Sequence, residues 1–386
     1  MARTLIRGLG LVFSGDIAAP RLDAEAILVE DGRIAGIGRA ADFDPADARV
    51  IEARGCAVMP GLIDNHVHPA FGDWTPRQNQ LGWIEAMVHG GTTTLVSAGE
   101  VHLPGRPRDP VGVKALAIAA QRAFSAFRPM GARVLAGAPV PERGLTAADY
   151  AEMAAAGVRW VGEFGLGTVK DEAEVVEVMG FVRAAGLNAM IHCGGPSIAG
   201  SNLMQAPVVI AADADIVAHI NGGPTSLPAA ELTKVIAGTT RAIEVVHNGN
   251  PRNALHAMGV LREMGRLDRL VLGTDSPAGS GVQPLGVLRT ISLLCSLGDL
   301  DPGIAIAAAG GNTARWRGIE AGVIAPGRAA DLVFLDAPIG GAGRDAAEAF
   351  AFGELPGIGM VMVDGNVMCA RSRNTPPAAR IPEVLA

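Results

Sequence analysis

Short apolar runs alternate with amphipathic stretches through the middle of the chain. The amphipathic stretches, such as residues 171–186 and 252–265, place apolar side chains at helical spacing, and the runs between them predict strands. The predicted strands cover residues 59–67, 93–99, 133–139, 159–164, 189–193, 215–220, 242–248 and 270–275.

The spacing of these strands predicts the fold class. The last five strand ends, at positions 163, 192, 219, 247 and 275, lie 29, 27, 28 and 28 residues apart. A strand-plus-helix unit that recurs at this length is typical of βα repeats, and eight of them close into a (β/α)8 TIM barrel. An open doubly wound sheet fits less well, because no Gly-rich phosphate-binding loop follows the first strand.

Both ends of the chain have a different pattern, with short apolar strands joined by turns. Asp-Gly pairs at 31–32 and 364–365 are turn signals between such strands. Two distant strand sets of similar character predict one small β-sandwich domain built from both termini. We therefore expect residues 1–58 and 322–386 to form this domain, with the barrel, residues 59–321, inserted between them.

Composition excludes several classes of partner. The net charge is −7 and aromatic residues make up 4% of the 386 residues, so the chain offers neither the basic stripe nor the stacking surface that nucleic acids require. No apolar run reaches 18 residues, and no membrane span is expected. The four cysteines are far apart and lack CxxC spacing, which disfavours disulfides and predicts a reducing, cytoplasmic location.

Histidines gather at the predicted strand ends, which converge on one site in a barrel. The first strand ends in Gly-Leu-Ile-Asp-Asn-His-Val-His-Pro, where His66 and His68 share one face because side chains alternate along a strand. A lone histidine at a strand end is more often a satisfied core residue, but here five of eight lie at such ends. The candidate set comprises His66, His68, Glu163, His192, His219, His247 and Asp275.

Four histidines with two carboxylates predict a site for two divalent metal ions. One catalytic metal typically keeps three protein ligands and an open position, so four histidines exceed its needs. Two metals about 3.5–4 Å apart suit hydrolysis. Glu163 lies on the strand between the two histidine pairs and is the expected bridging ligand; a solvated strand-end glutamate is the alternative. Cys193, next to His192, should point into the barrel wall.

These residues resemble the amidohydrolase superfamily along the whole chain. The likeness is carried by the stretches VEDGRIAGIG (29–38), PGLIDNHVH (60–68), GTDSP (273–277) and GVIAPGRAADLVFLD (322–336), together with the later histidines. The resemblance implies a metal-dependent hydrolase acting at a carbon bonded to nitrogen, oxygen or halogen. Many binuclear members bridge their metals with a carboxylated lysine on the fourth strand. This chain has Glu163 there, and Lys170 lies seven residues further on.

The resemblance also implies roles for the site residues. His66 and His68 would bind a first metal, zinc or iron, with Asp275 nearby; His192 and His219 would bind a second. The metals would activate a water molecule, and Asp275 would move its proton to the leaving nitrogen. The same resemblance implies a homo-oligomer, and a tetramer is expected because tetramers are common in the family.

Within the superfamily the likeness is greatest to hydrolases of cyclic enamides in nicotinate fermentation, through GRPRD (105–109), GPTS (223–226) and SRNTPPA (372–378). It implies a small-molecule substrate, a cyclic amide that carries a carboxylate. Arg77 and Arg106, in the loops after the first two strands, are candidates to bind that carboxylate, although each also fits a surface arginine. His102 and His247 would contact substrate or support a ligand.

Two alternatives stay open at this point. One is a different cyclic amidohydrolase, similar to imidazolonepropionase, dihydropyrimidinase or an N-acyl amino acid hydrolase. The other is a metal-binding relative without catalytic activity, although none of the expected ligands is missing.

Overall fold

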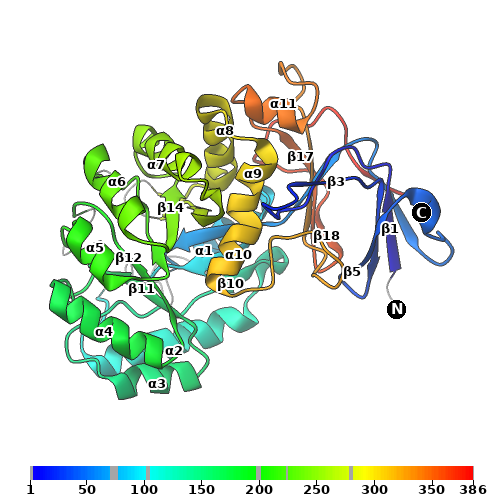
Figure 1. Cartoon of the computed structure of the whole chain (residues 1–386). Coiled ribbons are helices and arrows are strands. Elements are labelled where there is room, and N and C mark those ends of the chain that lie inside the picture. The colour runs from blue at the N-terminus through cyan, green and yellow to red at the C-terminus, as the bar shows by residue number, and fades with distance from the viewer. Residues whose placement is uncertain are drawn as a thin grey trace.

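The computed structural model describes residues 3–69, 77–100, 105–196, 201–222, 225–277 and 281–385, with the backbone alone for residues 77–81. Within these ranges, eight parallel strands form a barrel beside a β-rich region (Figure 1). The barrel strands are β8 (Leu62–Val67), β9 (Thr92–Ser97), β10 (Arg133–Leu135), β11 (Trp160–Phe164), β12 (Asn188–Ile191), β13 (Ile216–Val217), β14 (Ala242–Val246) and β15 (Leu270–Gly273).

Two seams close these strands into a ring. Strands β10, β9 and β8 pair in one parallel sheet and β11 to β15 in another. At one seam Gly162 N–H donates to the carbonyl of Pro139, just after β10, at 2.9 Å. At the other seam Asp275 N–H donates to the carbonyl of His66 at 2.9 Å. The predicted (β/α)8 arrangement is therefore present, with all eight predicted strands in their expected places.

Helices cover the outside of the barrel (Figure 1). Their starts follow ordinary capping chemistry: Asn250 accepts hydrogen bonds from Arg252 N–H and Asn253 N–H ahead of a helix whose first residue is proline. The covering helices are α1 (Arg77–His89), α2 (Pro110–Ala126), α3 (Ala147–Ala155), α4 (Glu172–Ala184), α5 (Ala206–Ala212), α6 (Ala229–Gly238), α7 (Pro251–Glu263) and α8 (Gly286–Gly298). Helices α9 (Pro302–Ala307) and α10 (Thr313–Arg317) follow, joined by a π-helical turn at Ala308–Asn312.

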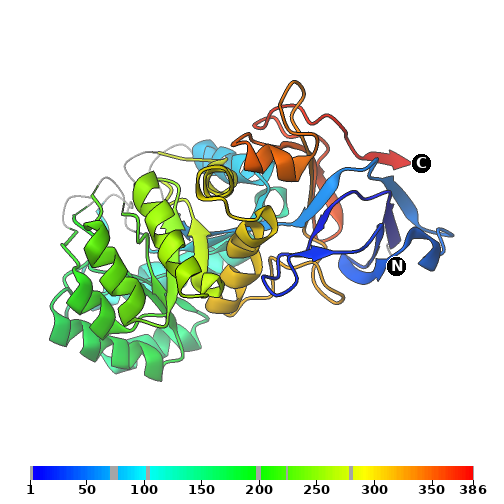
Figure 2. The same cartoon turned by 45° about the horizontal axis from the view of Figure 1, so that its top comes forward.

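Strands from the two termini pair with each other beside the barrel, as the views in Figures 1 and 2 show. One sheet has the order β19-β6-β1-β4-β5 and the other β18-β17-β16-β7-β2-β3. Their bounds are β1 (Arg3–Arg7), β2 (Val12–Phe13), β3 (Arg21–Leu22), β4 (Ala26–Glu30), β5 (Arg33–Gly38), β6 (Arg49–Glu52), β7 (Ala57–Pro60), β16 (Leu332–Asp336), β17 (Gly357–Val363), β18 (Asn366–Cys369) and β19 (Glu383–Leu385), with helix α11 (Ala346–Ala351) between β16 and β17.

Apolar side chains from both sheets share one core, which makes the pair a sandwich. Ile6, Ile27 and Ile51 of the first sheet pack with Phe334 and Met360 of the second. Burial of this much apolar surface is the main force that holds the two ends of the chain together. The domain boundaries at residues 58 and 322 stay a prediction.

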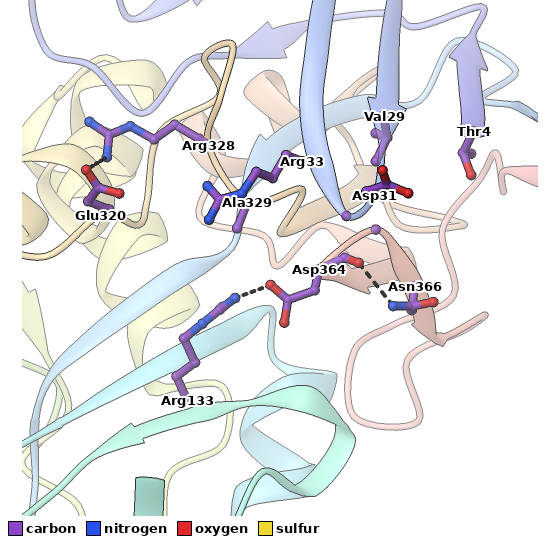
Figure 3. Close-up of a pocket in the computed structure, with 12 residues that line it drawn as sticks. Thr4, Val29, Asp31, Arg33, Arg133, Glu320, Arg328, Ala329, Asp364 and Asn366 are labelled. Carbon is purple, nitrogen blue, oxygen red and sulfur yellow. Dashed lines mark hydrogen bonds and ion pairs between the residues drawn. The ribbon is translucent and has the colours of Figure 1, made fainter. Parts of the chain in front are cut away.

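A polar cavity of about 640 Å³ lies between the sandwich and the barrel (Figure 3). Arg133, the first residue of β10, lines it, so the cavity is at the end of the barrel opposite to the predicted site. Four of the charged side chains that line it form ion pairs, Arg133 with Asp364 and Arg328 with Glu320 at 3.3 Å, while Arg33 donates to the Gly327 carbonyl at 2.8 Å. The cavity is thus an ion-paired seam between the two parts of the molecule.

None of the helices in the described ranges is long and apolar enough to cross a membrane.

Candidate metal centre

The six residues predicted as metal ligands lie together at the carboxyl ends of the barrel strands. Each is less than 6% exposed, so the group is removed from water. His66 is in β8 and Glu163 in β11, while the other four, His68, His192, His219 and Asp275, follow the ends of β8, β12, β13 and β15.

β-Bulges place the side chains of β8 and β11. In β8 the register with β9 shifts between Asp64 and Val67, and in β11 the register with β12 shifts between Val161 and Glu163. A bulge adds one residue to one strand, bends it and redirects its side chains. The extra residue in β11 is Gly162, immediately before Glu163. Simple alternation along the strand therefore describes the site only in part.

One half of the site is built around His66 and His68. Their Nε2 atoms are 3.2 Å apart, and both face Asp275, whose Oδ1 is 3.4 Å from His66 Nε2 and 3.3 Å from His68 Nε2. Glu163 Oε2 lies 3.4 Å from His66 Nε2 and 3.8 Å from His68 Nε2. Two imidazole nitrogens and two carboxylate oxygens thus gather in this half of the site.

The other half contains His192 and His219. His192 Nδ1 is 3.0 Å from His219 Nε2. Glu163 turns its second oxygen, Oε1, toward this pair, at 3.6 Å from His192 Nδ1 and 2.6 Å from His219 Nε2. The carboxylate of Glu163 therefore presents one oxygen to each half.

Hydrogen bonds on the far side of three rings determine which nitrogen faces the centre. His66 Nδ1 is 2.7 Å from Glu244 Oε2, His68 Nδ1 is 2.8 Å from the Gly99 carbonyl, and His192 Nε2 is 2.9 Å from the Gly195 carbonyl. An acceptor at each of these positions requires the proton there. The opposite nitrogen then carries a lone pair directed into the site, which is the tautomer that a metal-binding histidine needs.

A metal ion fits this donor set. Glu163 Oε1 is buried and has no hydrogen-bond partner among the described residues, although it lies within ion-pair distance of two imidazoles. Buried polar atoms are rarely left in this state. Three groups of three predicted residues each have ligand atoms that all lie within 4.8 Å of one another: His66, His68 and Glu163; His66, His219 and Asp275; and Glu163, His192 and His219. Imidazole and carboxylate are the usual ligands of zinc and iron.

The site favours positive charge. Burial disfavours the charged form of His66, yet the carboxylates around it, Glu244 first, raise its pKa well above the usual value. Burial opposes ionisation of Glu163 and Asp275 as well, but the neighbouring imidazoles lower the pKa of both carboxyls. The same field that holds a proton here would hold a cation in its place, because metals and protons compete for these ligands.

Sequence reasoning missed residues that contact the predicted ligands and the strands that carry them. Glu244, in β14, is fully buried against His66. Burial alone would raise the pKa of Glu244, but the His66 imidazole outweighs this effect and the pKa is lowered. Asp64 accepts from Thr274 Oγ1 at 2.6 Å and ties β8 to β15, and burial raises its pKa to about 7. An acidic residue inside an apolar strand, as in Ala-Ile-Glu-Val-Val, was the available signal.

Two further candidates are apart from the cluster. The Arg106 guanidinium is 3.0 Å from Glu142 Oε1, so its charge is already paired inside the protein, and burial lowers its pKa. His247 follows β14 and has its pKa lowered by burial and by Arg289. Within the described ranges, no ion pair or hydrogen bond joins its ring to the ligand cluster. His102 and the side chain of Arg77 lie outside the described residues.

Fold and site together define a class of protein, the barrels that carry a metal centre at the carboxyl ends of their strands. Residues 57–368 match the model of the Amidohydrolase family. The chain belongs to the amidohydrolase family.

Similarity to individual members extends over the whole chain. An enamidase from Eubacterium barkeri is 43% identical over 386 residues, covering 100% of both chains. A crystal structure of an enamidase at 1.9 Å resolution superposes with a TM-score of 0.95, again at 43% identity and covering 100% of both chains, which confirms the TIM-barrel fold. An adenine deaminase from Deinococcus deserti is 32% identical over 353 residues, which are 87% of this chain and 58% of the deaminase.

We expect Gly162→Ala to destabilise the protein by about 1–3 kcal/mol, the usual cost of overpacking. A Cβ at residue 162 would lie 2.7 Å from the Ala98 carbonyl oxygen, where no flexible side chain can give way. Gly180→Ala, in α4 with no atom within 4 Å, is the matched control and should be neutral or stabilising. The measurement is urea unfolding; equal stabilities in the two variants would contradict the close approach.

Proposed function

We propose that this chain hydrolyses the ring amide of a cyclic enamide with the help of two divalent metal ions, the reaction of an enamidase. The observation that carries the proposal is the carboxylate of Glu163, which faces His66 and His68 with one oxygen and His192 and His219 with the other. Full-length similarity to an enamidase supports the substrate class.

The proposed substrate is 1,4,5,6-tetrahydro-6-oxonicotinate. Hydrolysis of its lactam bond opens the ring to an enamine, which tautomerises to an imine. A second water releases ammonia and leaves 2-formylglutarate, so two waters are consumed for each ring. The carboxylate on the substrate and a homotetrameric assembly are parts of the same proposal.

The ligands in this proposal are His66 and His68 for one metal and His192 and His219 for the other, with Glu163 shared and Asp275 beside the first. Zinc and iron both suit these ligands. Bound there, the two metals would supply Lewis acidity that polarises the amide carbonyl and acidifies a water molecule.

The protein itself provides the proton transfer. The Asp275 carboxylate lies within 3.4 Å of the imidazoles of His66 and His68. Two hydrogen bonds fix its backbone: the Asp275 N–H donates to the His66 carbonyl, and the Asp275 carbonyl accepts from Asn248 Nδ2 at 2.9 Å. Its lowered pKa keeps it ionised near neutral pH. As a general base it takes a proton from the attacking water, and as the conjugate acid it returns the proton to the leaving nitrogen.

Ammonia release from a panel of cyclic amides tests the proposal. Purified enzyme never exposed to chelator should hold two divalent transition metals per chain and release ammonia fastest from the tetrahydro-oxonicotinate. If neutral lactams are turned over as fast as acidic ones, the proposal that the substrate carries a carboxylate is refuted. Two bound metals without ammonia from any member of the panel would favour a metal-binding relative that lacks this activity.

The bridging role of Glu163 can be tested against the nearest lysine. Glu163→Gln should lose at least one metal and most of its turnover, because an amide carries no charge and cannot offer two equivalent oxygens. Lys170, the candidate if a carboxylated lysine were the bridge, is exposed, so Lys170→Met should retain metal and activity. Elemental analysis and turnover of the two variants, measured side by side, decide between them; the reverse ranking would remove Glu163 as the bridge.

Asp275→Asn should keep the fold and most of the metal while losing rate. An amide can still place an oxygen toward the site but cannot accept a proton near neutral pH, and general acid–base catalysis typically contributes about 10²–10⁴-fold. Turnover is to be normalised to bound metal. A rate within about threefold of the parent would leave the proton transfer to some other group.

A further inference from the structure

We propose that Glu244 is a positioning residue that orders both halves of the metal centre at once, one through a side chain and the other through the backbone. The inference rests on the proposed function for the presence of metal. Glu244 touches neither substrate nor metal in this assignment; it acts through His66 and His219.

Three donors converge on the Glu244 carboxylate, which is fully buried. Its Oε2 accepts from His66 Nδ1 at 2.7 Å and from the backbone N–H of His219 at 3.0 Å, while Oε1 accepts from Asn65 Nδ2. An ionised carboxylate can only accept hydrogen bonds. His66 must therefore carry its proton on Nδ1, which leaves Nε2 as the lone pair directed toward Glu163 and Asp275.

The bond to His219 acts on the other half of the centre. His219 has a φ of 25°, in the left-handed region that residues other than glycine rarely adopt. The hydrogen bond from its N–H to Glu244 helps to hold this backbone, and the backbone in turn directs the His219 ring toward Glu163 Oε1. One carboxylate in β14 therefore constrains a ligand from β8 and a ligand that follows β13.

A buried arginine fixes the direction of the whole chain of hydrogen bonds. Arg317, in α10, is 2% exposed and donates from Nε to Asn65 Oδ1 at 2.5 Å and from Nη2 to the Asn65 carbonyl at 2.9 Å. A guanidinium has no acceptor, so the Asn65 oxygen must face it and the Asn65 NH₂ group must face Glu244. The positive charge of Arg317 therefore sets the orientation of Asn65, and the Asn65 NH₂ group and His66 Nδ1 both donate to Glu244.

Glu244→Gln tests this assignment, because a glutamine cannot accept all three hydrogen bonds. Its oxygen can serve His66 and His219, but its NH₂ group then faces the NH₂ group of Asn65. In the zinc-loaded enzyme we expect loss of metal to EDTA to be about 10–100-fold faster, the usual effect of removing a partner of a metal ligand. Both metals should be released faster, because one ligand in each half loses its support.

A compensating variant separates hydrogen-bond direction from general damage. In Asn65→Asp/Glu244→Gln the new carboxylate accepts from both Arg317 and the glutamine, so every donor again meets an acceptor and the total charge is unchanged. Metal retention should return most of the way to that of the parent. Asp336→Asn is the matched control: Asp336 is a buried carboxylate, 2.6 Å from Arg380, in the sandwich. It should lower the melting temperature without changing metal release.

The outcomes distinguish this inference from the proposed function. A parent enzyme without bound divalent metal would overturn the proposed function. A parent with two metals and a Glu244→Gln variant that releases them within about twofold of the parental rate would overturn the positioning role alone. So would release of one metal only, or failure of the double variant to restore retention. If Glu244→Gln does not fold, Asn65→Ala takes its place. This change removes both the NH₂ group that faces Glu244 and the oxygen that accepts from Arg317 Nε, and parental metal release from it would also refute the role.

Discussion

Burial of negative charge inside the barrel is the constraint on which the site depends. Glu163, Glu244 and Asp275 are all withdrawn from water, and a buried carboxylate is costly unless a positive partner compensates for it. Arg317 faces Glu244 through Asn65. For Glu163 and Asp275, in the described part of the chain, histidines are the only ion-pair partners. Although burial opposes it, the carboxylates raise the pKa of the His66 imidazole and hold positive charge there, and bound divalent metals would supply that charge instead.

The barrel meets this constraint with backbone irregularities rather than with ideal strands. The bulge in β8 allows consecutive residues, Asn65 and His66, both to reach Glu244, which strict alternation would forbid. The positive φ values of His219 and Asp275 lie at the same edge of the sheet. Such conformations persist where surrounding contacts enforce them, and they commonly mark functional sites.

The sequence was informative wherever a pattern repeats or a residue type is rare. Apolar periodicity and strand spacing predicted the eight barrel strands, and the scarcity of histidine made its gathering at strand ends visible. Glu244 escaped notice because one acid inside an apolar strand, taken alone, resembles an edge residue. The pairing of Arg106 with Glu142 also escaped, because partners 36 residues apart in sequence meet only through the fold. Neither bulge could be read from the sequence, since a bulge depends on which residues pair.

The glutamate on the fourth barrel strand sets a geometric requirement of its own. A glutamate side chain is much shorter than a carboxylated lysine, so it can bridge two metals only if its backbone approaches the centre closely. Gly162 lets β11 pass close to the chain that follows β9: β11 bulges there, and a methyl group on the Gly162 Cα would lie 2.7 Å from the Ala98 carbonyl oxygen. The Glu163 N–H then donates to the same carbonyl at 3.0 Å, which anchors the residue that faces both halves. In the proposed function, where Glu163 bridges the two metals, the bulge and the glycine thus belong with the short side chain, because a longer side chain at position 163 would need the strand to lie further from the centre.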